Sequence, residues 1–209
     1  MARESRQARM ETLRAYDLSI VTRGGDIILA GMDEAGRGPL AGPVVAACVR
    51  LPLTSALEWV DDSKKLSEKR RELLYDQIMA EAEAVGVGFA DAEEIDAVNI
   101  LQATRNAMRR AAAQVEADVY LIDAVTGLGL CGHEIPIIKG DATSYRIAAA
   151  SIIAKVTRDR WMREAALTWP GYGFEQHKGY GTAAHIAALR ELGPCPIHRK
   201  TFIGHFVAV

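Results

Sequence analysis

Two adjacent acids, Asp33 and Glu34, lie between two apolar segments of the chain. Residues 27–30 precede them, and residues 44–49 follow the glycine-rich stretch GMDEAGRGPLAGP that contains them. Both segments have the composition of buried strands, so the two carboxylates are carried to the border of a core. Carboxylates in such a place need a partner, because burial and like charge both disfavour ionisation.

Two further acids stand where strands are expected to end. Asp123 follows the apolar run 119–122, and Asp141 comes just after the segment 134–139. Strand ends commonly host the chemistry of α/β proteins, and neighbouring strands would bring all four carboxylates together. A divalent cation would relieve their repulsion, and oxygen-only ligands favour Mg²⁺ or Mn²⁺ over zinc. Carboxylates holding two such ions commonly catalyse phosphoryl hydrolysis.

Each acid also has a simpler interpretation. Asp33 and Glu34 before a glycine are typical of turns, Asp123 of an Asx turn, and Asp141 of a helix N-cap. Arg37 offers an alternative partner, since an ion pair would neutralise one acid. Taken singly, structural roles are favoured for Asp123 and Asp141. Taken together, the acids favour a metal-dependent phosphoesterase.

The pattern of apolar residues predicts an α/β fold. Strands are expected at 27–34, 43–51, 86–90, 119–122 and 134–139. Helices are expected at 66–85 with Ser67 as N-cap, from Asp91 through Met108, at about 144–168 and at 182–192. The first two strands are expected to pair antiparallel. We expect a polar N-terminal extension over 1–22 and one catalytic domain over 23–209, whose helical C-terminal lobe covers about 165–209.

Composition restricts the class of protein. The chain has 209 residues, of which 49% are apolar and 25% charged, as expected of a soluble globular protein with one sizeable core. No apolar run is long enough to span a membrane, and the N-terminus has no secretory signal. The three cysteines are dispersed and form no CxxC pair, which excludes a disulfide framework. The sequence has no HExxH pair, so a histidine-built zinc site has little support. A cytoplasmic location is expected.

The net charge of −2 is unevenly distributed. Residues 139–209 hold ten Lys or Arg and five acids, a net +5, which leaves −7 for residues 1–138. A second basic cluster comprises Lys64, Lys65, Lys69, Arg70 and Arg71. Such asymmetry suggests a phosphate-binding face. The alternative, that these residues are solvated surface, is favoured for any single run.

Several long motifs occur in one order along the chain: GMDEAGRGPLAGPVVAA, DDSKKLSEKRRELLYDQI, VYLIDA, KGDATSYRIAAASIIAKVTRDR, GYGFEQHKGYGT and GPCPIHRKTF. Together they closely resemble ribonuclease HII of bacteria over about residues 27–205. The resemblance implies a ribonuclease H-like mixed β-sheet flanked by helices, with a helical C-terminal extension.

The resemblance also implies an activity. The family cuts the RNA strand of RNA–DNA hybrids and nicks duplex DNA on the 5′ side of a single embedded ribonucleotide, leaving 3′-hydroxyl and 5′-phosphate ends. The expected cofactors are two Mg²⁺ or Mn²⁺ ions, and the expected substrates are these nucleic acids. A place in ribonucleotide excision repair and in replication follows.

Site residues follow from the resemblance too. The metal-binding acids fall on Asp33, Glu34, Asp123 and Asp141, with Asp33 as the expected bridging ligand. The turn Gly36-Arg37-Gly38 would recognise the ribose 2′-OH, the group that distinguishes RNA from DNA. Tyr180 would pack against the following deoxyribose, although a half-buried core tyrosine is the alternative. Phosphate contacts are expected from Lys64, Lys65 and Arg158.

The remaining expectations are negative or concern rival proteins. His177, His185 and His198 are expected to be surface or structural residues. The chain has GRG and lacks the N-terminal domain of ribonuclease HIII, so type HII is favoured. No tail that binds a sliding clamp is visible, and a monomer is expected. A DNA junction-resolving nuclease and a non-catalytic module that binds hybrids are the rival interpretations.

Overall fold

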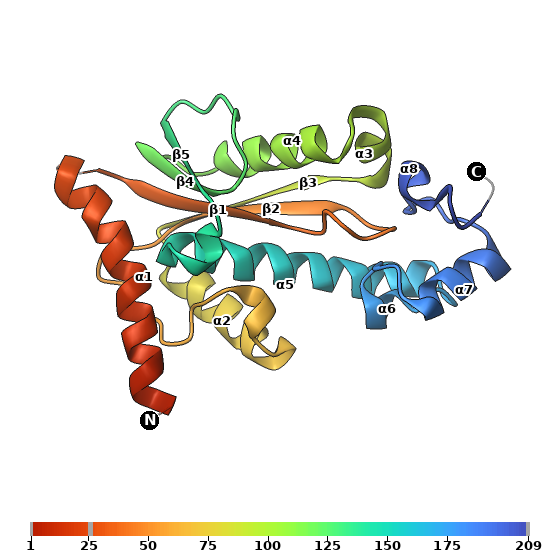
Figure 1. Ribbon diagram of the computed structural model, residues 1–209, viewed down its shortest axis with the longest axis horizontal. Helices are drawn as coiled ribbons and strands as arrows, with labels where there is room; N and C mark the ends of the chain where they lie inside the picture. The colour runs from red at the N-terminus through yellow and green to blue at the C-terminus, as the bar shows by residue number, and fades with distance from the viewer. Residues whose placement is uncertain (1, 25–26, 208–209) are drawn as a thin grey trace.

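A five-stranded mixed sheet forms the centre of the molecule (Figure 1). The computed structural model describes residues 2–24 and 27–207. The strand order is β3-β2-β1-β4-β5, with β1 parallel to β4, β4 parallel to β5, and the other pairs antiparallel. The strands are β1 Leu29–Ala35, β2 Val44–Arg50, β3 Ala84–Ala90, β4 Val119–Asp123 and β5 His133–Ile137. The predicted mixed sheet is confirmed.

Helices cover both faces of the sheet. In Figure 1, α3 and α4 lie on one side, and α5 and α2 lie on the other, while α6, α7 and α8 form a lobe around the C-terminal end of α5. The bounds are α1 Ala2–Gly24, α2 Glu68–Glu81, α3 Ala92–Val98, α4 Ile100–Ala112, α5 Tyr145–Thr168, α6 Phe174–His177, α7 Ala183–Leu192 and α8 Lys200–Ile203. Two short 3₁₀ turns are η1 Ser63–Lys65 and η2 Gly140–Ala142.

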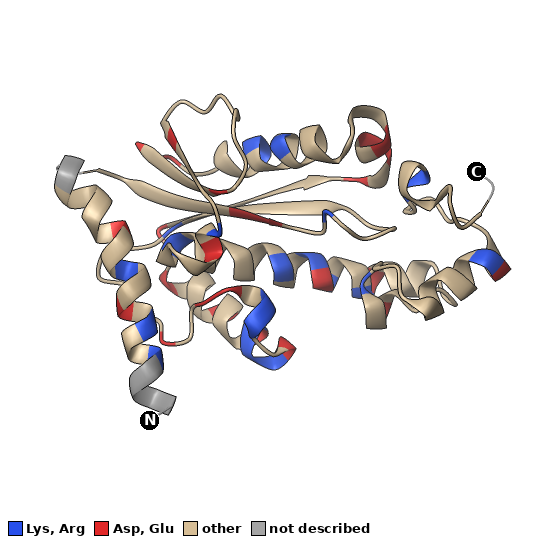
Figure 2. Cartoon of the chain, viewed as in Figure 1, with Lys and Arg blue, Asp and Glu red and all other residues tan. Residues whose placement is uncertain are grey.

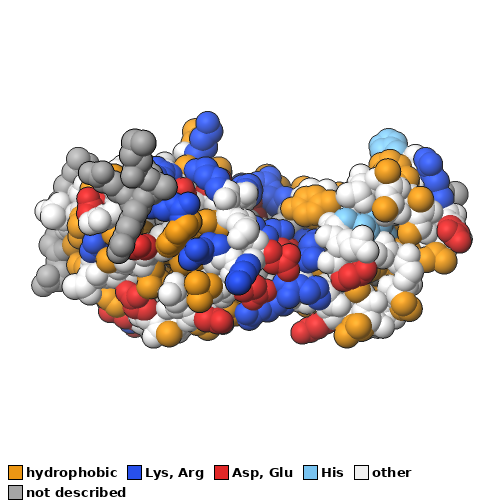
Figure 3. All heavy atoms as spheres, turned by 90° about the horizontal axis from the view of Figure 1, so that it is seen from below, with side chains coloured by type: hydrophobic (Ala, Val, Ile, Leu, Met, Phe, Trp, Pro, Cys, Tyr) orange, Lys and Arg blue, Asp and Glu red, His pale blue; other side chains and the backbone are white. Residues whose placement is uncertain are grey.

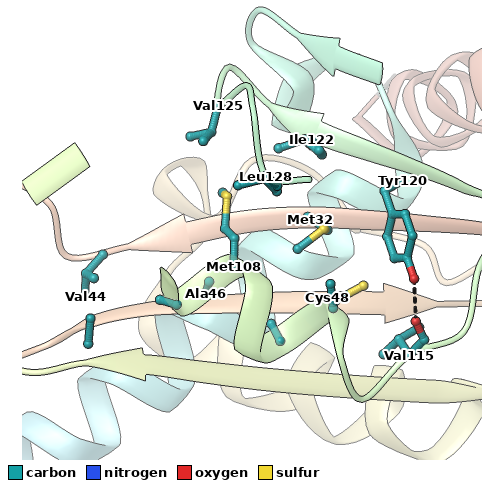
Figure 4. Packing of buried hydrophobic residues seen from close by; sticks show 14 of the residues in the cluster. Met32, Val44, Ala46, Cys48, Met108, Val115, Tyr120, Ile122, Val125 and Leu128 are labelled. Atoms are coloured by element: carbon teal, nitrogen blue, oxygen red, sulfur yellow. Dashed lines mark hydrogen bonds between the residues drawn. The ribbon is translucent and has the colours of Figure 1, made fainter. Parts of the chain in front are cut away.

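Each face of the sheet has its own apolar core. The core under α4 contains Met32, Cys48, Met108 and Ile122 (Figure 4), and the hydroxyl of Tyr120 at its edge donates to the Val115 carbonyl over 2.8 Å. The core on the other face packs α5 and α2 against β2 and β3. The central strand β1 is therefore buried on both sides, which explains why its sequence is almost continuously apolar until Asp33.

Glycines let the helices lie close to the sheet. A Cβ added at Gly31 on β1 would lie 2.2 Å from the backbone carbon of Arg146 in α5. On the other face, a Cβ at Gly88 on β3 would lie 2.0 Å from the carbonyl oxygen of Ala107 in α4. Both distances are far shorter than van der Waals contact, so a larger residue would force the helix away from the sheet.

The helix expected from Asp91 through Met108 is interrupted. Asp91 caps α3 by accepting from the Glu94 N–H over 2.8 Å, as predicted, but α3 ends at Val98. Asn99 then adopts a φ of +69°, and its side chain accepts from the N–H groups of Leu101 and Gln102, which caps α4. The prediction of one continuous helix is wrong because the positive φ and extended ψ of Asn99 break the helix, and its side chain supplies a second cap.

The N-terminal residues form helix α1, which packs against the start of α5. Met10 and Leu13 are buried, and Asp17 accepts from the backbone N–H and the guanidinium of Arg146 over 3.1 and 3.2 Å. Arg9 donates to the Ala142 carbonyl in η2 over 2.8 Å. The division into an extension over 1–22 and a catalytic domain over 23–209 stays a prediction. Within the described residues, no helix has the length and apolar character that a membrane span requires.

Substituting Gly31 by Ala is expected to lower the melting temperature. Overpacking of this kind costs about 1–3 kcal/mol, and each kcal/mol corresponds to roughly 2–4 °C for a chain of this size. Gly38→Ala is the matched control, because a Cβ there would meet no atom within 4 Å. Thermal unfolding followed by circular dichroism checks this. Equal melting temperatures for the two variants would contradict the close approach of α5 and β1.

Candidate active site

Three of the four predicted acids meet at one end of the sheet. Asp33 on β1 and Asp123 on β4 lie near the ends of neighbouring parallel strands, and Asp141 lies on η2. One carboxylate oxygen from each lies within 4.8 Å of those from the other two. The Gly140 N–H donates to Asp123 Oδ1 over 2.7 Å, which ties η2 to the end of β4. The expected convergence of strand ends is confirmed for these three acids.

Glu34, the fourth acid, lines the same cleft as Asp33 but stands outside the three-acid cluster. Adjacent strand residues point to opposite faces, so Glu34 approaches from another direction. Its Oε1 lies 3.4 Å from a guanidinium nitrogen of Arg37, and its Oε2 is buried without a hydrogen-bond partner among the described residues. The sequence analysis left two partners open, a metal ion and Arg37. Glu34 has one oxygen near Arg37 and one oxygen without a partner that could bind a metal ion.

The carboxylates oppose each other's ionisation. Burial, followed by the charges of Glu34 and Asp123, raises the pKa of Asp33 well above its usual range, and Asp141 adds to this. Burial also raises the pKa of Glu34 and of Asp141. Although burial acts in the opposite direction, the charges of Asp141 and Asp33 raise the pKa of Lys64. The cluster therefore attracts positive charge.

The donor set fits hard divalent cations. All the donors are carboxylate oxygens, the combination that Mg²⁺ and Mn²⁺ prefer, and a buried Glu34 oxygen is unpaired. Asp33, Asp123 and Asp141 would hold the ions, with Glu34 at the side. No histidine or cysteine of the described residues belongs to the cluster, so its chemistry does not suit zinc.

Lysines stand around the acids. Lys64 Nζ lies 3.6 Å from Asp141 Oδ2, with 78% of the side chain exposed. Lys65 faces away from the cluster and pairs with Asp61 over 3.4 Å. Lys155 on α5 lines the cleft and pairs with Asp159 over 2.7 Å. Of the two lysines predicted to contact phosphate, Lys64 borders the cleft, and the phosphate role of both stays a prediction.

The GRG turn is held from beneath by a residue that the sequence analysis did not single out. Arg199, which is fully buried, donates to the carbonyls of Gly36 and Arg37 over 2.6 and 2.8 Å and also to that of Gly42. Burial lowers the pKa of Arg199 to about 9, so it keeps its charge at neutral pH. The only feature of the sequence that could have pointed to Arg199 is its position in the motif GPCPIHRKTF.

This anchoring determines where the turn's other polar groups point. The described peptide bonds include no cis bond, and in a trans peptide the N–H points opposite to the preceding C=O. Because the carbonyls of Gly36 and Arg37 point inward to Arg199, the N–H groups of Arg37 and Gly38 point outward. Arg37 and Gly38 are both exposed. The turn thus presents two adjacent backbone donors at the cleft.

Arg158 does not fit the predicted phosphate contact. The side chain is completely buried, and its three nitrogens donate to the carbonyls of Pro43, Lys178 and Ala41 over 2.8, 3.0 and 3.1 Å. A Cβ at Gly36, where φ is +95°, would lie 2.0 Å from Arg158 Nε. Arg158 therefore supports the glycine-rich loop from the inside and has no surface for a substrate.

Tyr180 lies at the cleft, as the resemblance implied. The ring is 43% exposed and lines the same cavity as Asp33, Gly36 and Gly38. The guanidinium carbon of the buried Arg158 lies 5.9 Å from the ring centre, and Nζ of the partly buried Lys155 lies 5.8 Å from it, so cationic groups lie near the ring. The exposed side is available to a ligand. The ring is too exposed for the half-buried core tyrosine that was the alternative, and its role toward the substrate stays a prediction.

Basic surface is less extensive than the residue count suggested. Bands of basic and acidic residues alternate along α2 and α5 (Figure 2), and Lys and Arg side chains gather over the middle of the face shown in Figure 3. Arg160 and Arg163 both pair with Glu72, over 2.5 and 2.8 Å. Arg146, Arg158 and Arg199 are buried. Lys155 pairs with Asp159, and Lys178 Nζ donates to the Glu175 carbonyl, so most of the ten basic residues behind the inferred charge asymmetry have structural partners.

Asp33→Asn is expected to raise the stability of the metal-free protein and to remove its stabilisation by metal. Because burial and the neighbouring acids raise the folded-state pKa of Asp33, its ionisation costs folding free energy at neutral pH, and the Asn variant should melt at a higher temperature. The difference should shrink at lower pH, as Asp33 becomes protonated. Thermal unfolding with and without Mg²⁺ or Mn²⁺ measures both effects. Asp76→Asn, an exposed acid on α2, is the control. Unchanged stabilisation by metal in Asp33→Asn would refute the ligand assignment.

Comparisons with known proteins identify the family of this chain. A model of the family described as Ribonuclease HII matches residues 30–205. The ribonuclease HII of Geobacter metallireducens is 57% identical over 188 residues, which cover 89% of this chain and 88% of that protein. The ribonuclease HII of Ruminiclostridium cellulolyticum is 50% identical over 201 residues, covering 95% of this chain and 78% of that protein.

A solved structure supports the same assignment. The crystal structure of ribonuclease H2 from Pyrococcus horikoshii OT3 is 26% identical, with a TM-score of 0.70 over 83% of this chain and 92% of that chain. The resemblance inferred from the motifs and the ribonuclease H-like fold are both confirmed. The chain belongs to the ribonuclease HII family and is a hydrolase of the ribonuclease H type, an endonuclease.

Proposed function

We propose that this chain hydrolyses the RNA strand of RNA–DNA hybrids and nicks duplex DNA on the 5′ side of a single embedded ribonucleotide, leaving 3′-hydroxyl and 5′-phosphate ends. One observation carries the proposal: Asp33 and Glu34, the GRG turn and Tyr180 line a single cleft, and Asp123 and Asp141 lie beside Asp33. The groups that would hold divalent cations therefore border the same cavity as the groups that would contact the sugars. Such an activity would serve the removal of ribonucleotides during repair and replication.

Asp33, Glu34, Asp123 and Asp141 would hold two Mg²⁺ or Mn²⁺ ions at the scissile phosphate. When bound, such ions activate a water molecule and stabilise the leaving oxygen. Among the four acids, Asp33 is the one whose pKa is raised by the charges of all three others, so a bound cation would favour its ionisation, in keeping with the expected role of Asp33 as the bridging ligand. Lys64, beside Asp141, would contact the non-bridging oxygens of the phosphate.

The outward N–H groups of Arg37 and Gly38 would recognise the 2′-hydroxyl. A hydroxyl oxygen accepts from backbone N–H groups, and a deoxyribose offers no such acceptor at that position. The inward carbonyls are held by Arg199, so the donors need little reordering when the sugar arrives. Because the turn follows Asp33 and Glu34 directly, recognition of the ribose places its phosphate at the acids.

The first test is cleavage of a DNA duplex that carries one ribonucleotide. We expect a single metal-dependent nick 5′ to that ribonucleotide and no cleavage of the all-DNA duplex. Gly38→Ala tests the turn, because an added Cβ would meet no protein atom but would stand beside the proposed donors. We expect about a tenfold loss of kcat/KM, or about 1.4 kcal/mol, at an unchanged melting temperature. Gly36→Ala is less informative, since it would also displace Arg158.

Other outcomes of this assay would replace the proposal. Metal-dependent cleavage of both duplexes would indicate a nuclease without ribose recognition, such as a junction-resolving enzyme. Binding of the hybrid without cleavage in Mg²⁺ or Mn²⁺ would indicate a non-catalytic module.

Tyr180→Ala is expected to reduce cleavage at the ribonucleotide more than it reduces binding. The ring is expected to pack against the deoxyribose that follows the ribonucleotide. Losing this contact would leave the substrate poorly positioned at the acids but would not affect metal binding. We expect a fall in kcat of about tenfold, which corresponds to about 1.4 kcal/mol. Tyr180→Phe, which keeps the ring, is the control. Single-turnover kinetics on the same duplex measure this, and equal rates for Ala and wild type would refute the role.

A further inference from the structure

Three histidines pack together beneath the loop that carries Tyr180. His185 and His198 are buried, and their Nε2 atoms lie 3.0 Å apart. The His177 ring stacks on that of His185, with ring centres 4.4 Å apart and planes at 14°. The mechanism proposed above uses none of them. Two imidazole nitrogens at this distance must share one proton, so the direction of each hydrogen bond can be deduced.

The deduction starts at the Tyr180 carbonyl, which can only accept. His185 Nδ1 lies 2.9 Å from this oxygen, so Nδ1 carries a proton and donates it. In a neutral ring His185 Nε2 is then an acceptor, and the proton between the two rings belongs to His198 Nε2. His198 Nδ1 is therefore an acceptor as well. It accepts from the Cys195 N–H over 3.0 Å.

The third ring fits the same reasoning. His177 Nδ1 accepts from the Gly179 N–H over 3.2 Å, so its Nε2 donates to the Tyr172 carbonyl over 2.7 Å. All three imidazoles thus satisfy both ring nitrogens while neutral. The chain of bonds from Cys195 N–H through His198 and His185 to the Tyr180 carbonyl runs in one direction, and we call it the histidine relay.

The surroundings keep the relay neutral. Burial lowers the pKa of His198 to about 4 and also lowers the pKa of His185. The titratable groups that face the pair are His177, Cys195 and Tyr172, and burial raises the pKa values of Cys195 and Tyr172, so neither is an anion at neutral pH. No carboxylate among the described residues bonds to either ring.

We propose that His185 and His198 are positioning residues that hold the Tyr180 backbone through the histidine relay, and thereby set the place of the Tyr180 ring at the cleft. This inference rests on the proposed role of Tyr180. Two further hydrogen bonds hold the same backbone. The Tyr180 N–H donates to the His177 carbonyl over 2.9 Å, and the Tyr180 carbonyl also accepts from the Thr182 N–H. Both backbone groups of Tyr180 are thus fixed, and only the ring is free to meet a ligand.

The relay is joined to the GRG turn through one dipeptide. His198 belongs to the relay, and the next residue, Arg199, holds the carbonyls of Gly36 and Arg37. The same segment pairs with the glycine-rich loop, since Arg199 N–H donates to the Leu40 carbonyl over 2.9 Å. The two elements that would contact the sugars on either side of the junction therefore share one support, which fixes their separation.

The proton positions are tested directly by long-range ¹H–¹⁵N correlation spectra of the histidine-labelled wild-type protein at neutral pH. We expect His185 as the Nδ1–H tautomer and His198 as the Nε2–H tautomer, with the exposed His133 and His205 as internal references. A protonated Nε2 on His185, or a cationic ring in the pair, would overturn the relay. This measurement does not depend on activity, so it decides the relay even if the proposed cleavage is not found.

The positioning role is tested by His185→Leu and His185→Asn on the duplex with one ribonucleotide. The Asn amide can replace Nδ1 as donor to the Tyr180 carbonyl, and Leu cannot. We expect kcat to fall about tenfold in the Leu variant, comparable to Tyr180→Ala, with KM little changed, and to be largely retained in the Asn variant. His205→Asn is the control.

The double variant His185→Leu, Tyr180→Ala separates positioning from general destabilisation. We expect it to be no slower than Tyr180→Ala alone, because His185 acts through Tyr180. Fully additive losses would overturn the proposal, and so would equal rates for the Leu and Asn variants at matched melting temperature. If Tyr180→Ala itself cleaves like the wild type, the proposed role of Tyr180 fails, and the positioning role of the histidines fails with it.

Discussion

The mutual repulsion of buried carboxylates is the constraint on which the rest of the structure depends. Asp33 lies on the central strand, and its pKa is raised first by burial and then by the three other acids. Ionisation of Asp33 therefore costs folding free energy, which matters because the net stability of a domain is only about 5–15 kcal/mol. The apolar packing on both faces of β1 offsets this free-energy cost. Lys64 also places a positive charge beside Asp141. Divalent cations would relieve the same repulsion.

The loop next to the acids is organised by a different interaction. Arg158 and Arg199 are buried guanidinium groups that donate to backbone carbonyls rather than to carboxylates. A buried charge is costly unless its donors are satisfied, and the carbonyls of a glycine-rich loop can approach closely enough to satisfy them. The direction of these carbonyls in turn directs the N–H groups of Arg37 and Gly38 outward. Buried arginines thus turn a flexible sequence into a rigid pair of donors.

The C-terminal lobe completes the cleft rather than standing apart from it. Its segment around His198 and Arg199 pairs with the glycine-rich loop through an isolated bridge between Ala41 and His198. Arg158 reaches from α5 to the carbonyl of Lys178 in the same region. The elements proposed to read the two sugars therefore belong to one hydrogen-bonded unit, although they lie some 140 residues apart along the chain.

The sequence by itself determined most of the elements, the four candidate acids and the family. Apolar periodicity and capping residues are local properties, and the motifs follow one another in a fixed order, so they could be read without coordinates. Only the tertiary structure decided that Asp33, Asp123 and Asp141 meet while Glu34 stands aside, that Arg158 is internal, and that Arg199 and the histidines support the cleft. The physical reason is that burial and hydrogen-bond direction depend on residues distant in sequence, and an arginine or histidine has the same sequence signal whether it faces a phosphate or a carbonyl.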